Sequence, residues 1–182
     1  MKKTVLKFGF ISGGLLAVLM FATLPFAHRI GLQAGMIIGF TSMLLAFMLV
    51  FFGIRSYREN VNGGEISFLR AFNVGLLIML IGVACYVVTW QIVYFNFLPN
   101  FFEEYTAVAL NQMKAAGKSA QEIETQRQEL ELVGKRYHNP LWNAAYTSLE
   151  PLPIGIPVTL ISAIILRRKR KHLTSTEQVA TS

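Results

Sequence analysis

Glu150 is the residue whose type and position in this sequence could most readily do chemistry. It opens a proline-rich stretch, EPLPIGIP, within an otherwise apolar segment that ends at Leu166. Counting back about 20 residues from Leu166, the length that crosses a bilayer, places Glu150 about one helical turn inside the hydrocarbon. An acidic side chain at that depth needs a partner or a water-filled cavity.

The prolines after Glu150 predict a kinked or broken helix. Pro151, Pro153 and Pro157 have no backbone N–H, so carbonyl groups of the preceding turn are left without helical partners. A carboxylate beside such a break can bind an ion in a carrier, or it can anchor an irregular helix end. Both hypotheses stay open, and Glu150 is our candidate functional polar residue.

No other residues form a recognisable reactive motif. The single cysteine, Cys85, lies in an apolar run, where it excludes an intrachain disulfide and suits a packing role. His28, His138 and His172 are scattered, and no Ser-His-Asp order, phosphate loop or HExxH motif is present. We therefore predict no catalytic residue, no metal and no cofactor, and we expect that the protein is not an enzyme.

Composition places these residues in a membrane protein. Hydrophobic residues make up 53% of the 182-residue chain and charged residues only 15%, with a mean hydropathy of +0.47. The net charge of +7 does not point to nucleic acid, because the charges flank apolar segments and no recognition module accompanies them.

Four apolar segments are long enough to span a bilayer: residues 8–27, 35–54, 71–98 and 141–166. The first is predicted to be a retained helix, since it is too long for a signal peptide and Pro25-Phe26-Ala27 is a poor cleavage site. We predict an all-α integral membrane protein with a single membrane domain over residues 1–172. Residues 173–182 are predicted to be a disordered tail.

The distribution of basic residues predicts the orientation. Eleven of the 17 lysines and arginines lie at the N-terminus, between the second and third segments, or in the run after Leu166. Basic residues collect on the cytoplasmic side of a membrane. Both termini are therefore predicted to be cytoplasmic, with residues 99–140 on the outer side.

The outer segment is predicted to form an amphipathic helical hairpin over about residues 100–138. Gly117 can end its first helix, and Ser119 with Glu122 matches a capping box for the second. Asn139-Pro140 is a start signal for the next helix. The apolar edges of the hairpin could pair with each other, lie on lipid or dock a partner.

Two other groups of residues bear on helix packing. Glycines recur at four-residue spacing, which lets helices approach closely either within the chain or in a homo-oligomer; they are Gly9, Gly13, Gly31, Gly35 and Gly39. Polar side chains of the third segment (Asn73, Gln91 and Asn96) are explained by interhelical hydrogen bonds. In the loop before the third apolar segment, Asn62-Gly63-Gly64 predicts a turn, and Ser67 is predicted to be a helix N-cap.

Three stretches, in this order, carry a resemblance to a known family: GIRSYRENVNGGEISFLRAFNVGL, then KAAGKSAQEIE and YHNP, and last EPLPIGIP followed by LRRKR. On these stretches the chain resembles the bacterial membrane-protein family known as domain-of-unknown-function family 4199. The resemblance implies a multi-pass protein of the bacterial inner membrane with about four helices. It supplies no activity and no residues of known role.

These observations lead to one functional prediction and one alternative. We expect a non-enzymatic component of the inner membrane that binds a protein partner or lipid, including a possible homo-oligomer. The alternative is a small carrier or channel subunit that uses Glu150 and the broken fourth helix. A carrier needs Glu150 to face a water-filled cavity, whereas a scaffold lets it bond to nearby backbone or to Arg29.

Overall fold

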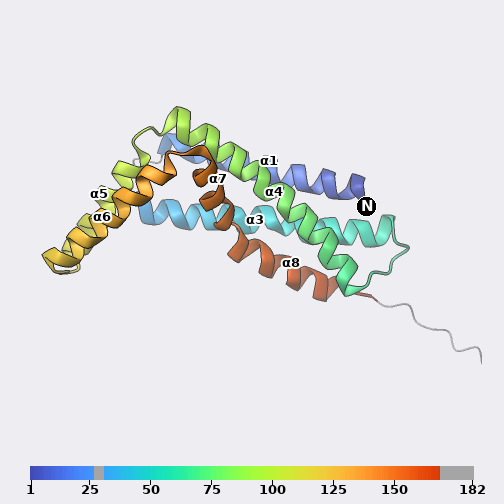
Figure 1. Ribbon diagram of the computed structural model, residues 1–182. Coiled ribbons are helices and arrows are strands. Elements are labelled where there is room, and N and C mark those ends of the chain that lie inside the picture. Colours follow the sequence, from blue (N-terminus) through green and yellow to red (C-terminus); the bar gives the residue numbers. More distant parts are fainter. Residues whose placement is uncertain (27–30, 169–182) are drawn as a thin grey trace, which may run out of the picture.

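The protein folds into helices. The computed structural model describes residues 1–26 and 31–168, where one isolated bridge, Ile66 with Arg168, is the sole β pairing. The elements are α1 (Lys2–Thr23), the short 3-10 helix η1 (Leu24–Phe26), α3 (Leu32–Asn60), α4 (Phe68–Phe97), α5 (Phe101–Ala115), α6 (Ala120–Tyr137), α7 (Pro140–Leu149) and α8 (Leu152–Leu166) (Figure 1). The all-α prediction is confirmed for the described residues.

Three helices are long and apolar enough to cross a membrane by themselves: α1, α3 and α4. The α7–α8 pair qualifies only when taken together, because the chain bends by 42° between the two helices. The described chain thus has three candidate spans, or four with the bent pair. The predicted tail at 173–182 lies outside the described residues, as do His28, Arg29 and His172.

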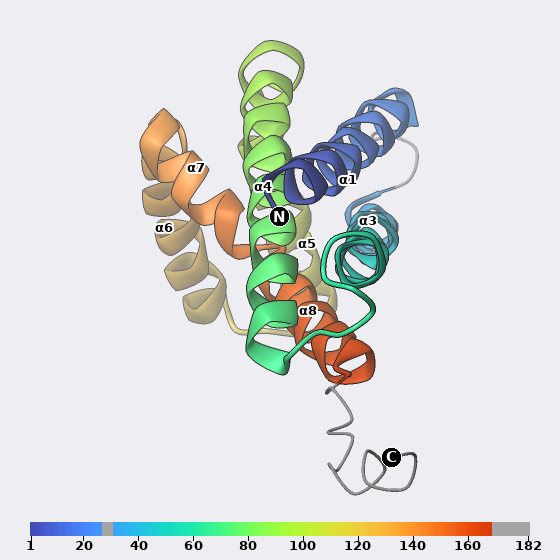
Figure 2. The same cartoon turned by 90° about the vertical axis from the view of Figure 1, so that its right-hand side faces the viewer.

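Helix α4 crosses the other spans obliquely, between α1, α3 and α8 on one side and α6 and α7 on the other (Figure 2). The core lies at this crossing, where Phe47 and Val50 of α3 meet Val74 and Ile78 of α4, all with 0% exposure. Many large apolar side chains on the outer faces of α1, α3 and α4 are exposed, as expected of surfaces that contact lipid.

Local signals set the helix boundaries. The Ser67 side chain accepts the Arg70 N–H, so α4 begins at Phe68, three residues before the predicted apolar segment. Ser119 and Glu122 form the predicted capping box, and Gly117 has a φ of +72° between α5 and α6. The Asn139 side chain accepts the Leu141 N–H, with Pro140 as the first residue of α7. These four predictions are confirmed.

Helices α5 and α6 form an antiparallel hairpin that extends beyond the end of the bundle where α4 ends (Figure 1). The helices approach closely near the base, where a Cβ added at Gly134 would lie 2.7 Å from the Phe102 ring. No residue of α5 is buried, and α6 buries only Gly134 and Tyr137. The two helices of the predicted hairpin therefore pack on each other, while most of their surface stays open.

Candidate functional site

The predicted break in the fourth apolar segment falls at Glu150 and Pro151. Glu150 is the C-cap of α7, and its N–H reaches only the Thr147 carbonyl oxygen, at 3.4 Å. Since Pro151 and Pro153 have no N–H, the carbonyl groups of Thr147 and Leu149 cannot receive the usual bonds from four residues ahead. The break therefore follows from the proline positions, as the sequence predicted.

Glu150 is bound by a residue that the sequence did not indicate. The Tyr86 hydroxyl of α4 donates a hydrogen bond of 2.8 Å to Glu150 Oε2. Tyr86 is only 9% exposed, whereas Glu150 itself is exposed. The expected partners were nearby backbone or Arg29; Arg29 lies outside the described residues, and the observed partner is a side chain from another helix.

A second polar network lies close by and joins α4, α6 and α7. Trp90 Nε1 of α4 donates to the Tyr137 hydroxyl at 2.9 Å, and this hydroxyl lies 3.3 Å from Thr147 Oγ1. Thr147 donates to Asn143 Oδ1 at 3.4 Å, and Gln91 Nε2 reaches the same oxygen at 3.3 Å. Asn143 and Thr147 have 0% exposure, so the centre of the network is closed to solvent, while Trp90 and Gln91 at its edge are half-buried.

The direction of the hydrogen bonds in this network is determined by its donors. The single hydroxyl proton of Thr147 goes to Asn143, so Tyr137 donates to Thr147 and accepts from Trp90. Burial raises the pKa of the Tyr137 hydroxyl, which therefore stays protonated and able to donate. The Asn143 amide donates back to the Tyr137 carbonyl oxygen at 3.3 Å. This network fixes the base of the hairpin to α4 and α7.

Tyr94 belongs to the aromatic cluster beside this network. Its ring lies 4.9–6.2 Å, centroid to centroid, from the rings of Trp90, Phe95, Phe101, Tyr137 and His138. The Tyr94 hydroxyl is buried and has no hydrogen-bond partner among the described residues. Tyr86, Trp90 and Tyr94 recur every four residues on α4, a spacing that could have revealed this polar and aromatic face.

The polar residues predicted within the third segment have different roles. Gln91 makes the expected interhelical bonds, donating also to the Pro140 carbonyl oxygen at 2.9 Å. Asn96 instead donates to Ile92 O in its own helix, and Asn73 is exposed. Among the described residues, no group of three or more His, Cys, Asp or Glu side chains is placed to hold a metal ion.

The candidate packing glycines separate into two groups. A Cβ at Gly9 would lie 2.7 Å from Ile81 Cβ, and one at Gly13 would overlap Cys85, so both permit close packing of α1 on α4. Gly31, Gly35 and Gly39 have no neighbouring atoms within 4 Å of such a Cβ. The structure thus uses the first two glycines within the chain and leaves the other three open.

The fold and the site define a class of protein: a helical protein with three or four candidate membrane spans, a bent final span and a projecting hairpin of two helices. The chain belongs to the family described as protein of unknown function DUF4199, whose model matches residues 7–168. The family resemblance predicted from the sequence is confirmed. No curated protein and no solved structure matches the chain.

Proposed function

We propose that the protein is a non-enzymatic membrane component that binds a protein partner through the α5–α6 hairpin. The observation that carries this proposal is the contrast between the base of the hairpin and the rest of it. At the base, Tyr137 is held by Trp90 and Thr147, whereas beyond the base no α5 residue is buried. A hairpin that is rigidly fixed at its base and open over the rest of its surface suits recognition, because little conformational entropy is lost on binding.

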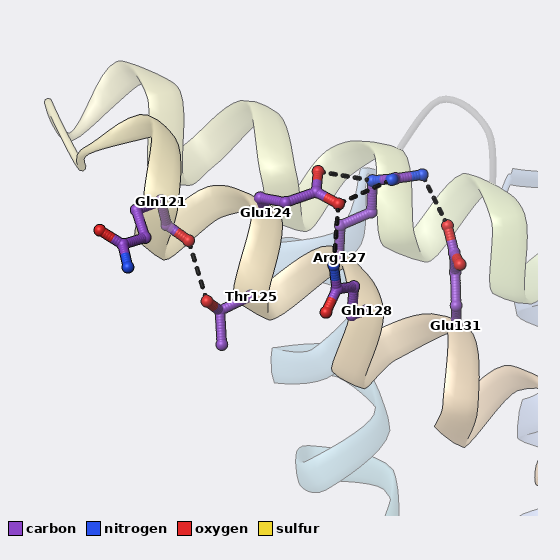
Figure 3. A network of polar contacts seen from close by, with 6 residues as sticks. All are labelled: Gln121, Glu124, Thr125, Arg127, Gln128 and Glu131. Atoms are coloured by element: carbon purple, nitrogen blue, oxygen red, sulfur yellow. Dashed lines mark hydrogen bonds and ion pairs between the residues drawn. The ribbon is translucent and has the colours of Figure 1, made fainter.

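The charges of α6 favour an aqueous partner over lipid. Arg127 lies between Glu124 and Glu131, with nitrogen–oxygen distances of 2.8 Å to each (Figure 3). Lys118 pairs with Glu122 at 3.0 Å, and all five side chains are about half exposed. Such a face would be strongly disfavoured in hydrocarbon. The hairpin therefore belongs outside the membrane, and we propose that it lies on the outer side of a bacterial inner membrane.

Photo-crosslinking in native membranes tests this function. A photoreactive amino acid at Leu132, which is 58% exposed on α6, should join the protein to one defined partner protein. The same group at Leu160, 37% exposed on the candidate span α8, serves as the control and should react mainly with lipid. Native mass spectrometry of the detergent-released protein should show the same complex. A monomer without a crosslinked partner would refute the proposal.

Glu150 favours a second candidate function, a small carrier or channel subunit. The observation is a carboxylate at a helix break, bound on one oxygen by Tyr86 in a partly buried place. Two shallow, open hollows of the described surface lie elsewhere, one on the hairpin and one between α1 and α4, and Glu150 lines neither. Glu150→Gln should abolish transport-linked phenotypes if this candidate is right. Unchanged protein level and unchanged phenotypes would exclude it.

A further inference from the structure

The opposite end of the bundle from the hairpin carries a cluster of arginines from three helices. Arg58 lies near the end of α3, Arg70 in the first turn of α4, and Arg167 and Arg168 directly after α8. We call these four residues the arginine end. Figure 1 shows that the α3–α4 loop, the end of α8 and the N-terminus all lie at this end.

Contacts connect the segments that carry these arginines. The Arg70 guanidinium lies 6.0 Å from the centre of the Tyr57 ring, beside Arg58 in the chain. Arg58 Nη1 donates to the Leu166 carbonyl oxygen at 3.2 Å, directly before Arg167. Arg168 then pairs with Ile66 through two backbone hydrogen bonds of 2.9 and 3.0 Å, and Ile66 lies two residues before the start of α4. The loop and the end of α8 are thus fixed side by side.

The charge of the arginine end is only partly compensated. Arg55, near the end of α3, is a fifth arginine in this region. The acidic residues here are Glu59 of α3 and Glu65 of the α3–α4 loop. Glu59 pairs with both Arg55 and Arg58, at 3.1 and 3.0 Å. The side chains of Arg70, Arg167 and Arg168 are exposed. Three exposed arginines therefore lie close to the ends of the apolar parts of α3, α4 and α8.

We propose that the arginine end binds the phosphate headgroup of an anionic phospholipid. Guanidinium groups hold phosphate oxygens through paired N–H donors. The exposed apolar faces of the same helices would contact the acyl chains, as a membrane lipid requires. In this proposal Arg58 is a positioning residue, because its guanidinium is held by Leu166 and Glu59 and fixes the end of α8.

Native mass spectrometry of the full chain, stripped of lipid in an uncharged detergent, tests the proposal. The probes are phosphatidylglycerol, phosphatidylcholine with the same acyl chains, and inorganic phosphate. Phosphatidylglycerol should bind saturably and about tenfold more tightly than phosphatidylcholine. Equal binding of the two lipids would overturn the proposal. Tight binding of inorganic phosphate without a lipid preference would also overturn it, by assigning the site to a soluble anion.

A matched pair of variants separates a site from general attraction. Arg70→Gln with Arg168→Gln should weaken phosphatidylglycerol binding about tenfold, while the backbone pairing of residue 168 with Ile66 is kept. Arg127→Gln with Arg136→Gln removes the same charge from the exposed hairpin and should stay within about twofold of wild type. Equal weakening by both pairs, or by neither, would overturn the proposal. Circular dichroism should show unchanged helix content in all variants.

Discussion

Tyr94 and Tyr137 lie in one aromatic cluster, with ring centroids 5.2 Å apart, but their hydroxyl groups have different surroundings. The Tyr137 hydroxyl bonds to Trp90 and Thr147, whereas the Tyr94 hydroxyl has no partner among the described residues. A buried hydroxyl with partners contributes to stability, and one without partners opposes it. The two tyrosines therefore form a matched comparison.

We expect Tyr137→Phe to destabilise the protein by about 1–3 kcal/mol, because the Trp90 N–H and the Thr147 hydroxyl would lose their partner in a buried place. Tyr94→Phe should change stability by less than about 0.5 kcal/mol or increase it. Reversible unfolding of the full chain in mixed detergent measures both. An equal loss in the two variants would show that the Tyr94 hydroxyl does have a partner.

The same approach applies to Tyr86, the partner of Glu150. Tyr86→Phe removes the donor and should cost about 1 kcal/mol, the usual size of a side-chain hydrogen bond between membrane helices. Tyr146→Phe is the control, because the Tyr146 hydroxyl makes no hydrogen bond within the described residues. If the two variants unfold alike, the Tyr86–Glu150 bond contributes nothing to the stability of the bent span.

At the scale of the helices, the contact of α1 with α4 depends on Gly13. Gly13→Leu should destabilise the protein by about 1–3 kcal/mol, because even its Cβ would overlap Cys85. Gly35→Leu should be tolerated within about 0.5 kcal/mol, since no neighbouring atom lies within 4 Å of the added Cβ. Unfolding measurements on the two variants compare them directly, and equal losses would contradict the packing described for α1.

The first turn of α6 should respond to acid. Bonds from the Ser119 backbone N–H, the Lys118 ammonium and the Ser119 hydroxyl lower the pKa of Glu122 to about 2. Since this pKa lies below the unfolded value, the stabilising contribution of Glu122 is full above about pH 4.5 and is lost as the pH falls towards 2. An NMR titration of labelled glutamate carboxyl carbons should give a midpoint near 2, and a midpoint near 4.5 would show that the capping box is open.

The range of each interaction along the chain explains which elements the sequence could predict. Ser67, Ser119 and Asn139 bond to backbone groups two or three residues away, so their caps were visible as local patterns. The Tyr86–Glu150 bond joins residues 64 positions apart, and Trp90–Tyr137 joins residues 47 apart. Periodicity can place such side chains on a helix face, but only tertiary packing selects the partner. The four-residue spacing of glycines was ambiguous for the same reason, because spacing alone cannot tell which glycines another helix of the chain contacts.

At the scale of the whole molecule, the charges imply one orientation in the membrane. The N-terminus and the arginine end share one end of the bundle, and the hairpin lies at the other (Figure 1). Because basic residues are retained on the cytoplasmic side, we expect both termini inside and the hairpin outside. The side of the membrane on which each end lies is accessible to chemical labelling.

Single cysteines in a Cys85→Ser background provide that measurement. Ala116→Cys, on the exposed tip of the hairpin, should react with a membrane-impermeant thiol reagent added to intact cells. Val61→Cys, 51% exposed in the α3–α4 connection, is the matched control and should react only after lysis. The reverse pattern would place the hairpin in the cytoplasm and would move the proposed partner there. It would also leave the arginine end facing the outer leaflet, so the labelling result decides which leaflet must supply the anionic lipid.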